Sequence, residues 1–502
     1  MTRHVVVIGG GISGLTALEQ LVRRAPDVRV TLLEGSSRLG GHIRTERRDG
    51  YIMEAGPDVL LAAKPAAVDL ARRVGLGERL RGTNPAVKGS YILSGTRLLR
   101  MPEGLTGLVP SRVRPFVTTP LISPLGKLRV GLDYLIPAAR DGREESIEAF
   151  VTRRLGREMY ERLVEPLLSG ISAGDGARLS MQAMFPQLLA WERDHGGLIR
   201  GMLASRRSAR AQGKAPGQGT RPAPMGFVSF PTGLEELPEA VARYARGQDA
   251  SGGKIEIRVG TAVRRVARAR NPSGALGFSV ELSDGGLLDA DAVVVATPAY
   301  ISAGLLRSMD AGLAQELDGI EYGSTVTVSL SYPASAVPRT LDATGYVVPR
   351  VLKRPVLACT WVSAKFEARA PQGQALFRVF LGGVGRGSWV EHEDRDIEDL
   401  VRHEMQEIMG ITAAPQFVDI NRYHRAMPQY NVGHLDRVSR IEQRAGAIPG
   451  LALAGAAFRG VGIPDCVQSG LRAADAVLAH LGLDAARASA TPAGPSAEAR
   501  SP

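Results

Sequence analysis

The feature that most constrains the fold is a glycine-rich turn near the N-terminus, in the stretch VVVIGGGISGL at residues 5–15. The residues around its start, 4–8, are β-branched and apolar, which is typical of a short strand buried in a parallel sheet. A helical pattern follows the glycines and ends at Ala25-Pro26, and residues 28–34 (VRVTLLE) repeat the strand pattern. This order predicts a β-α-β unit and therefore an α/β fold.

The spacing inside this turn, Gly9-x-Gly11-x-x-Gly14, is typical of a dinucleotide-binding site. The first glycine permits a tight turn, the second lets the backbone approach a pyrophosphate, and the third allows the helix to pack closely on the strand. The helix N-terminus offers free N–H groups and a partial positive charge to the phosphates. Glu34, twenty residues after Gly14, ends the second strand, where it would accept hydrogen bonds from ribose hydroxyls. The alternative is the same unit with no ligand at the turn.

A second glycine-rich turn stands near the C-terminus, in GAAFRGVGIPDCVQSG at residues 455–470. It follows an apolar strand pattern at 451–455 and leads into a helical pattern that begins near Ile463-Pro464, where proline is tolerated in the first turn. An ordinary glycine-rich helix cap would explain this stretch as well as a ligand site would. By itself, the second turn therefore does not predict a binding site.

The composition is that of an ordinary globular protein, with 502 residues, of which 44% are hydrophobic and 23% charged. This length exceeds what one hydrophobic core usually serves and predicts two or three domains. The net charge of +11 is one feature of nucleic-acid-binding proteins, but no stripe of alternating aromatic and basic residues and no zinc module accompanies it. We therefore expect no nucleic-acid partner, and steering of a small polyanion is another use for the charge.

The two cysteines, Cys359 and Cys466, are too few for a disulfide framework and fit a reducing compartment. The N-terminal apolar run is broken by glycines and lacks a cleavage site, unlike a signal peptide. No window of eighteen uninterrupted apolar residues occurs, so we expect no membrane-spanning helix. The histidines have no metal-ligand spacing, so we expect no metal site. We predict a cytoplasmic protein with at most peripheral membrane contact.

The predicted secondary structure and the composition change along the chain. Helical patterns dominate residues 109–205, and the basic, Gly/Pro-rich segment 206–226 is predicted to be a flexible loop. Residues 485–502 have the composition of a disordered tail. The other predicted elements are a hairpin at 46–54, a helix from Pro65 to Val74, a helical stretch at 144–168, strands within 254–296 and at 324–332, 355–363 and 375–383, and a helix at 396–410.

Two short motifs indicate which dinucleotide would bind. Arg38-Leu39-Gly40-Gly41 follows the predicted ribose-binding acid and resembles the R-x-G-G segment of the flavin amine oxidase and protoporphyrinogen oxidase superfamily, which simple NAD dehydrogenases lack. GVGIPDC at 460–466 is similar to the C-terminal signature of protoporphyrinogen and coproporphyrinogen oxidases. Further segments resemble that family in the same order: MEAGPD at 53–58, EPLLSGISAGDGARLSMQAMFPQL at 165–188, SFPTGLEELPEAV at 229–241 and MPQYNVGHLDR at 427–437.

The resemblance covers residues 4–482 and is closest to the soluble coproporphyrinogen III oxidase type of Gram-positive bacteria, which residues 114–138 also resemble. It implies a mixed α/β fold with a Rossmann-like FAD-binding domain of the p-hydroxybenzoate-hydroxylase and amine-oxidase type. It also implies an antiparallel-sheet substrate domain and a helical domain that touches the membrane in some members. The implied ranges are 1–82, 227–305 and 437–484 for the FAD-binding domain, 83–108 and 306–436 for the substrate domain, and 109–205 for the helical domain.

By the same resemblance, we expect an FAD-dependent oxidase that removes six electrons from coproporphyrinogen III in three flavin cycles. Molecular oxygen would accept the electrons, giving hydrogen peroxide and coproporphyrin III for haem biosynthesis. Protoporphyrinogen IX oxidase is the first alternative, followed by a flavin amine oxidase or a carotenoid desaturase. A flavoprotein with little turnover of its own, which acts as a partner of later haem enzymes, is the alternative from a different class.

In such an enzyme the flavin carries the chemistry, so no general base is assigned. The first turn would hold the ADP end of a non-covalent FAD, and the second would aim its helix N–H groups at the N1–C2=O edge of the flavin. Lys64 is the candidate for binding a substrate carboxylate, with a solvated surface lysine as the alternative. The implied cofactor contacts are Gly9, Gly10, Gly11, Ile12, Ser13, Gly14, Glu34, Gly35, Arg38, Gly40, Gly41, Gly56, Pro57, Asp58, Val59, Val263, Tyr423, Val461, Gly462 and Ile463.

Three residues depart from the family pattern or suggest another chemistry. Val59 stands near a position where relatives usually carry Ser or Asn, and Ser172 where they carry Tyr, which leaves the local packing of flavin and substrate open. The stretch at 170–174 matches the G-x-S-x-G elbow of hydrolases, but a helical pattern precedes it where the elbow needs a strand. Cys466 would be a covalent flavin attachment point in some amine oxidases, yet its place inside the helix start predicts a small buried side chain.

Overall fold

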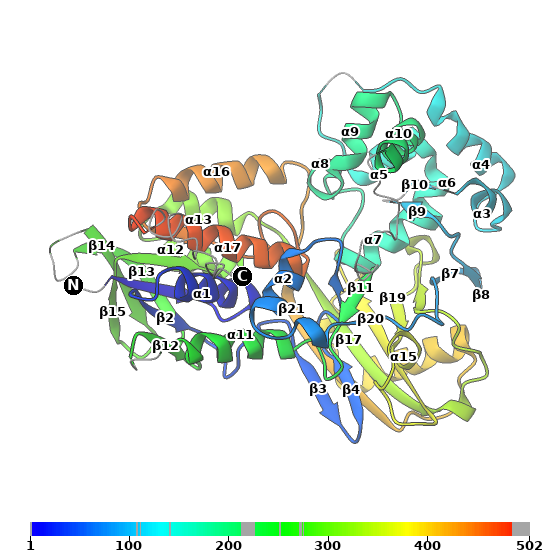
Figure 1. Ribbon diagram of the computed structural model, residues 1–502. Coiled ribbons are helices and arrows are strands. Elements are labelled where there is room, and N and C mark those ends of the chain that lie inside the picture. The colour runs from blue at the N-terminus through cyan, green and yellow to red at the C-terminus, as the bar shows by residue number, and fades with distance from the viewer. Residues whose placement is uncertain are drawn as a thin grey trace, which may run out of the picture.

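The computed structural model describes residues 3–106, 109, 110, 112–139, 142–211, 226–249, 253–270, 274 and 276–483. The predicted tail and most of the predicted basic loop lie outside these ranges. Figure 1 shows three parts: an α/β part at the left that contains the first and last elements, an antiparallel sheet at the lower right, and a group of helices above that sheet.

The α/β part is built on a parallel sheet with the strand order β12-β2-β1-β16-β22. The β-α-β prediction is confirmed, because α1 (Ile12–Arg24) connects β1 (His4–Ile8) to its parallel neighbour β2 (Arg29–Leu33). The other strands are β12 (Ile255–Arg258), β16 (Ala292–Val295) and β22 (Leu451–Leu453).

Side chains of β1 enter two cores in alternation, Val5 and Val7 on one face of the sheet and Val6 and Ile8 on the other. Burial on both faces explains why the strand is an unbroken apolar run. The first core is completed by α1, α2 (Ala66–Arg73), α11 (Glu236–Gly247) and α17 (Ile463–His480). The second is completed by α12 (Ala299–Leu306), α13 (Ala311–Asp318), α16 (His434–Gly446) and the antiparallel strands β13 (Val263–Arg270), β14 (Leu276–Leu282) and β15 (Leu287–Ala290).

The large sheet has the order β21-β17-β20-β19-β18-β7-β8 and is antiparallel except where β18 meets β7. Helix α15 (Asp394–Met409) covers one face and buries Ile397, Val401 and Met405. The strands are β7 (Tyr91–Ser94), β8 (Arg97–Arg100), β17 (Tyr322–Pro333), β18 (Gly345–Val347), β19 (Val356–Trp361), β20 (Gln374–Gly382) and β21 (Phe417–Pro428). The sequence did not predict β21, because this edge strand is only partly buried and its polar residues hide the alternation.

A short hairpin follows β2 in the chain. The predicted hairpin is confirmed: β3 (Thr45–Arg48) pairs with β4 (Tyr51–Glu54), and Asp49 and Gly50 in the turn have φ values of +49° and +82°. Other short elements are β5 (Leu60–Leu61), β6 (Arg81–Gly82), β9 (Leu105–Thr106), β10 (Val109–Pro110), β11 (Phe227–Ser229) and α14 (Val362–Lys365).

The helical part corrects two predictions. The helical stretch at 144–168 is broken at Gly156, whose φ of +94° cannot continue an α-helix. The predicted loop at 206–226 starts too early, because α10 continues through Arg- and Ala-rich sequence to Ala211. The helices are α3 (Val113–Thr118), α4 (Pro124–Gly131), α5 (Ile147–Leu155), α6 (Arg157–Met159), a π-turn (Tyr160–Val164), α7 (Glu165–Ser172), α8 (Met181–Met184), α9 (Pro186–His195) and α10 (Leu198–Ala211).

Within the described residues, no helix combines the length and the apolar character that crossing a bilayer requires.

Candidate functional site

The N-terminal glycine turn lies between the carboxyl end of β1 and the start of α1. A Cβ atom on Gly14 would overlap the carbonyl oxygen of Gly9, so only glycine lets the helix pack this closely. Gly9 has a φ of +106°, and its amide donates to the Leu33 carbonyl at 2.8 Å. At Gly11, in contrast, a Cβ would meet no atom within 4 Å. The turn is tight on its protein side and open at Gly11, which fits an approaching phosphate.

Glu34 follows β2, and its carboxylate faces the same turn. One carboxylate oxygen accepts a hydrogen bond from the Gly10 amide at 2.6 Å, and the other accepts from the Ser36 amide at 2.8 Å. The Glu34 carbonyl accepts from the Thr261 amide at 2.8 Å, two residues before Val263 at the start of β13. The acid predicted for the ribose therefore lies beside the segment predicted for the adenine.

The Arg38–Gly41 loop folds back onto the first turn. The Gly40 amide donates to the Gly10 carbonyl at 2.8 Å. A Cβ on Gly41 would lie 3.3 Å from Gly11 Cα, so these two backbones are in close contact. The two motifs that the sequence analysis assigned to the dinucleotide are thus brought together.

The Arg38 side chain bonds to the backbone of its own loop. Its guanidinium donates to the carbonyls of Leu39 and Ile43 at 3.0 Å each, and also to the carbonyl of Gly41. It lies 3.5 Å from the Glu235 carboxylate as well. These contacts make Arg38 a residue that holds the loop closed against the first turn.

The C-terminal glycine turn leads into α17, which begins at Ile463 with Gly462 as its N-cap. Ser13 Oγ, in the first turn of α1, donates to the Cys466 carbonyl at 2.9 Å. A Cβ on Gly470 would overlap the Ser13 carbonyl oxygen, so α17 and α1 are in backbone contact. The two helices begin side by side (Figure 1). Both glycine turns therefore converge at the carboxyl end of the parallel sheet, where α/β folds bind ligands.

Gly56 and Tyr423 lie together although they come from distant parts of the chain. A Cβ on Gly56 would overlap the His42 carbonyl oxygen and lie 3.6 Å from the Tyr423 hydroxyl. The rings of His42 and Tyr423 meet edge to face, with centroids 5.5 Å apart. Burial lowers the pKa of His42 and raises the pKa of Tyr423, so both rings are neutral near neutral pH. Through Tyr423, the edge strand β21 reaches the site.

Side chains of the antiparallel sheet hold the segment that follows β4. Arg378 on β20 donates to the carbonyls of Glu54 at 2.7 Å and Gly56 at 2.8 Å. Thr327 on β17 donates to the carbonyl between them, that of Ala55, at 2.9 Å. Three consecutive carbonyls are therefore fixed by the sheet, which sets the position of the Gly56-Pro57 backbone.

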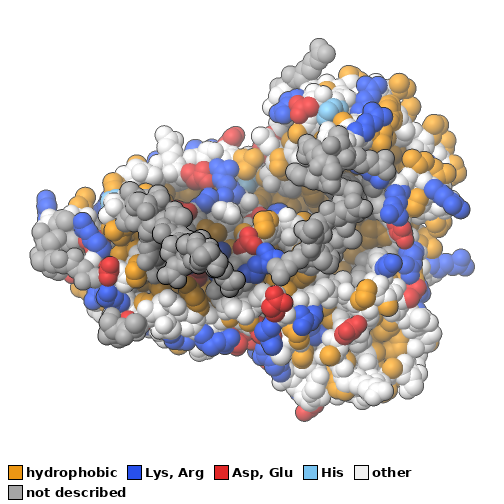
Figure 2. All heavy atoms as spheres, in the orientation of Figure 1, with side chains coloured by type: hydrophobic (Ala, Val, Ile, Leu, Met, Phe, Trp, Pro, Cys, Tyr) orange, Lys and Arg blue, Asp and Glu red, His pale blue; other side chains and the backbone are white. Residues whose placement is uncertain are grey.

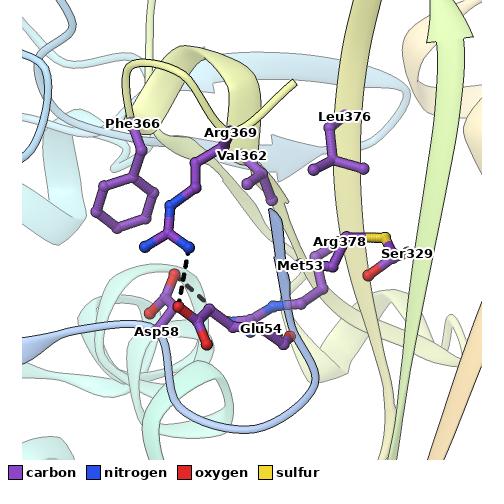
Figure 3. Close-up of a pocket in the computed structure, with 9 residues that line it drawn as sticks. All are labelled: Met53, Glu54, Asp58, Ser329, Val362, Phe366, Arg369, Leu376 and Arg378. Carbon is purple, nitrogen blue, oxygen red and sulfur yellow. Dashed lines mark hydrogen bonds and ion pairs between the residues drawn. The ribbon is translucent and has the colours of Figure 1, made fainter. Parts of the chain in front are cut away.

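Charged side chains gather beside this segment around a small pocket (Figure 3). Lys365 Nζ lies 2.6 Å and Arg378 Nη2 3.4 Å from the same carboxylate oxygen of Asp58. Arg369 pairs with Glu54 at 3.0 Å. Burial alone would raise the pKa of Asp58, but the two cations outweigh it and lower that pKa to about 2. Burial raises the pKa of Glu54 in spite of Arg369. Three cations face two carboxylates in this cluster, so it carries surplus positive charge.

Four of these residues were not predicted from the sequence: Arg378 and Thr327 in the large sheet, Lys365 at the end of α14, and Arg369 in the loop after α14. They stand singly on separate elements, outside the motifs that were assigned a role. One signal was present: Arg378 is a lone charge inside the apolar run ALFRVFL, and a charge buried in a strand needs a partner. The partners themselves could not be read from the sequence.

The other predicted contacts fall around the same region. A Cβ on Gly35 would lie 3.4 Å from Ala262 Cβ, beside the Glu34 segment. Val59 packs against the apolar cluster that includes Val362 and Phe366. Ile12 and Ser13 open α1, Pro57 precedes Asp58, and Val461 precedes the N-cap of α17.

Lys64 is half exposed and pairs with a carboxylate of the protein itself. Its Nζ lies 2.8 Å from both carboxylate oxygens of Asp465 in the first turn of α17. A Cβ on Gly460 would overlap the Asp465 side chain, so this carboxylate rests on the second glycine turn. Lys64 therefore stands beside the second turn, but its ammonium is already engaged.

Two candidate nucleophiles are structural. Ser172 ends α7 and its Oγ donates to the Leu168 carbonyl at 3.0 Å, so the hydrolase elbow is absent from this described segment. Cys466 is buried, and burial raises the pKa of its thiol to about 12, which keeps it protonated. In the described ranges, no group of three or more His, Cys, Asp or Glu side chains is arranged to hold a metal ion.

Together, the open N-terminal turn, the acid at the end of β2 and the second helix start have the arrangement that is typical of dinucleotide-binding α/β proteins. The second turn lies beside the first, and its glycines have no Cβ atoms. A flat ring at the far end of a cofactor could therefore approach its backbone closely. Such an arrangement is typical of α/β redox proteins.

Residues 12–478 match the model of the flavin containing amine oxidoreductase family, and the chain belongs to this family. A coproporphyrinogen III oxidase of Bacillus subtilis (strain 168) is 37% identical over 487 residues, which cover 95% of this chain and 98% of the relative. A coproporphyrinogen III oxidase of Propionibacterium freudenreichii is 36% identical, over 99% of this chain and 93% of the relative. A solved structure of a proposed protoporphyrinogen oxidase from Exiguobacterium sp. 255-15 is 32% identical, covers 96% of this chain and 99% of its own, and has a TM-score of 0.81.

Proposed function

We propose that the protein is an FAD-dependent oxidase that converts coproporphyrinogen III to coproporphyrin III for haem biosynthesis, with oxygen as electron acceptor and hydrogen peroxide as co-product. The observation that carries the proposal is the convergence of the two glycine turns in a chain that matches coproporphyrinogen III oxidases along nearly its whole length. Protoporphyrinogen IX is the alternative substrate, because the related solved structure is described as that of a proposed protoporphyrinogen oxidase.

Each part of a non-covalent FAD has residues that suit it. The first turn would bind the pyrophosphate, Glu34 the ribose and the Val263 segment the adenine side. Gly56 to Val59, Tyr423 and Val461 to Ile463 would surround the isoalloxazine ring. The buried, protonated thiol of Cys466 supports non-covalent binding. When bound, the flavin would supply two-electron oxidation of the substrate.

The chain's own residues would orient the reactants and exclude water. Arg378 and Thr327 fix the Gly56 backbone, so the substrate side of the pocket is built on a rigid sheet. The surplus positive charge of Lys365, Arg369 and Arg378 would stabilise negative charge that develops nearby. His42 and Tyr423 are neutral and need no role as a base.

For Lys64, we keep the role of binding a substrate carboxylate. A propionate would compete with Asp465 for the ammonium, and the 52% exposed Lys64 side chain leaves room for this exchange. The excess of basic over acidic side chains, which gives a net charge of +11, would attract a tetra-anionic substrate.

For location, we propose a cytoplasmic protein with peripheral membrane contact through the helical part. Val113, Leu125 and Leu135 are each nearly four-fifths exposed, and Arg112 and Arg114 stand among them. Figure 2 shows hydrophobic side chains gathered over the α3 and α4 end of the molecule. Apolar side chains with basic neighbours suit an anionic bilayer surface. Sedimentation with anionic vesicles, compared with zwitterionic ones, tests this contact.

Two measurements test the function. The purified protein should show flavin absorbance and release FAD on denaturation, as expected for a cofactor held without a covalent bond. Oxygen-dependent growth of porphyrin fluorescence, compared between coproporphyrinogen III and protoporphyrinogen IX, then ranks the substrates, and peroxide should accumulate with the product. Activity on amines alone would overturn the proposal, and bound FAD without turnover would favour a role as a partner of later haem enzymes.

A further inference from the structure

Two buried aromatic side chains, Tyr430 and His434, lie under the C-terminal glycine turn. Both come from the segment MPQYNVGHLDR, between the end of β21 and the first turn of α16. We propose that Tyr430 and His434 are positioning residues that fix the turn at 456–460, and hence the α17 N-terminus, for the flavin ring. This inference rests on the proposed function, because it concerns the same cofactor site.

Tyr430 closes the turn at both ends through one hydroxyl group. The hydroxyl donates to the Ala456 carbonyl at 2.6 Å and accepts from the Gly460 amide at 2.7 Å. Only 3% of the Tyr430 surface is exposed, so water cannot readily replace either bond. A phenylalanine at this position would fill the same space but leave both backbone groups without this partner.

His434 holds the middle of the same turn. Its Nε2 lies 2.9 Å from the Phe458 carbonyl, and its ring stacks on that of Tyr430 with centroids 4.0 Å apart and planes 12° from parallel. Burial lowers the pKa of His434, so the ring is neutral, and Nε2 carries the proton that it donates to the carbonyl. The two stacked rings thus satisfy three backbone groups of one short turn.

The turn needs outside support because two of the residues that lead into α17 are glycines, which have no side chains to hold the backbone. Gly460 has a φ of +145°, and Gly462, as the N-cap of α17, offers no side chain to the first N–H groups of the helix. The direction of those N–H groups therefore depends on where the preceding turn is held. Tyr430 and His434 bond its backbone from outside.

The segment that carries the two rings also joins the three parts of the molecule. The Tyr430 carbonyl accepts from the Ser180 amide at 2.7 Å, at the start of α8 in the helical part. Tyr430 follows β21, which carries Tyr423 at the predicted ring site. The second turn is therefore positioned by the antiparallel sheet and the helical part, whereas the first turn is positioned within the α/β part.

The test is Tyr430→Phe, with Tyr346→Phe as the matched control. Tyr346 is buried in the core of the antiparallel sheet, and its hydroxyl bonds weakly to sulfur, that of Met405 at 3.9 Å and that of Cys359. The protein stripped of flavin is titrated with FAD and, separately, with ADP. We expect Tyr430→Phe to raise the Kd for FAD roughly tenfold and to leave the Kd for ADP unchanged, because ADP uses the first turn. Tyr346→Phe should change neither.

His434→Gln and His434→Leu provide the second arm. Glutamine can place an amide N–H near the position of Nε2, so it should restore FAD binding to within a few-fold of the natural protein, whereas leucine should match Tyr430→Phe. With FAD saturating, the weakened variants should show a shifted flavin spectrum and a lower kcat with unchanged KM. Equal losses of FAD and ADP affinity, or no loss of either, would overturn the positioning role. If the unmodified protein binds ADP but not FAD, the proposed cofactor itself is wrong.

Discussion

The two glycine turns look alike in sequence but are stabilised in different ways. The N-terminal turn is held by its immediate neighbours, with backbone bonds to β2 and the Arg38–Gly41 loop and one carboxylate, that of Glu34. The C-terminal turn is held by side chains from remote segments: Tyr430 and His434 from below, and Asp465 with Lys64 at its far end. A turn within a β-α-β unit is therefore stabilised by residues of that unit and of the loop after it, whereas a turn where several parts of the molecule meet is stabilised by side chains from distant segments.

The same contrast extends to the segment after β4. Its carbonyls are held by Arg378 and Thr327, which belong to the antiparallel sheet. The proposed ADP end of the site is thus built by one part of the molecule, and the proposed flavin end by several. Substitutions at the first turn should therefore weaken the binding of every ligand that contains ADP. Substitutions at the second turn or in the segment after β4 should weaken only the binding of the flavin end.

The largest effect is expected for Gly14→Val. The new side chain would overlap the Gly9 carbonyl, so α1 would be forced from β1 and the binding of both ADP and FAD should be lost. Absorbance of bound flavin per protein and titration with both ligands measure the loss, and circular dichroism reports folding. The control is Gly304→Ala in α12, where the added methyl group meets no atom within 4 Å. If Gly14→Val still binds ADP, the first turn is not the site for the ADP part of the cofactor.

A smaller and more selective effect is expected for Gly460→Ala. The alanine Cβ would overlap Asp465, and a non-glycine residue at a φ of +145° costs about 1–3 kcal/mol. FAD affinity should fall roughly tenfold or more, while ADP affinity should stay as it is. Titration of the flavin-free protein with each ligand decides this. Parallel losses for both ligands would show that the two turns do not act separately.

Next in size is the effect of Asp58→Asn on stability. The fall in the pKa of Asp58 from 3.8 to about 2 corresponds to about 2 kcal/mol of stabilisation. Because the pKa is lowered in the folded protein, this stabilisation is complete above about pH 4 and is lost as the pH falls toward 2. We expect Asp58→Asn to lose it at pH 7 and to unfold with a flatter pH dependence between pH 4 and pH 2.

Urea unfolding at a series of pH values measures this difference. The matched control is Asp27→Asn, since the side chain of Asp27 is 97% exposed and its pair with Lys254 is on the surface. An Asp58 variant with the pH profile of the Asp27 variant would show that Lys365 and Arg378 do not stabilise the segment through Asp58.

The smallest effect is expected for the pair of Lys64 and Asp465. Because Lys64 is half exposed, a double-mutant cycle with Lys64→Met and Asp465→Asn should give a coupling energy below about 1 kcal/mol. Lys64→Met should nevertheless raise the KM for coproporphyrinogen III by a few-fold, with FAD affinity unchanged. An unchanged KM would remove Lys64 from the substrate site and leave it a structural partner of Asp465.

The parts of the fold that the sequence predicted are those in which local pattern and burial agree. Strands β1, β2 and β16 are apolar runs buried on both faces, and the hairpin of β3 and β4 is marked by Asp49-Gly50. The prediction was wrong where one residue changes the backbone, as at Gly156, and where a basic composition concealed the helix that continues to Ala211. The edge strand β21 was missed because edge strands lack a continuous apolar face.

For the candidate site, the residues that belong to motifs were predicted from the sequence. The side chains that hold those motifs in place were not. Gly11 and Gly41 were predicted separately and are found in contact, as are Gly56 and Tyr423. Tyr430 and His434 lay inside a recognised segment, yet nothing in their spacing assigned them to the turn at 456–460. Arg378 and Lys365 had no motif at all.

The amino-acid sequence was sufficient to predict the β-α-β unit, its glycine turn and the acid at the end of β2. These features depend on residues close in the chain, whose backbone geometry and hydrogen bonds are set locally. Only the tertiary structure decided which side chains hold the second turn and the Gly56 segment, and that Lys64 faces Asp465. Such contacts join residues tens to hundreds of positions apart, and they form only when packing of the separate cores brings the elements together.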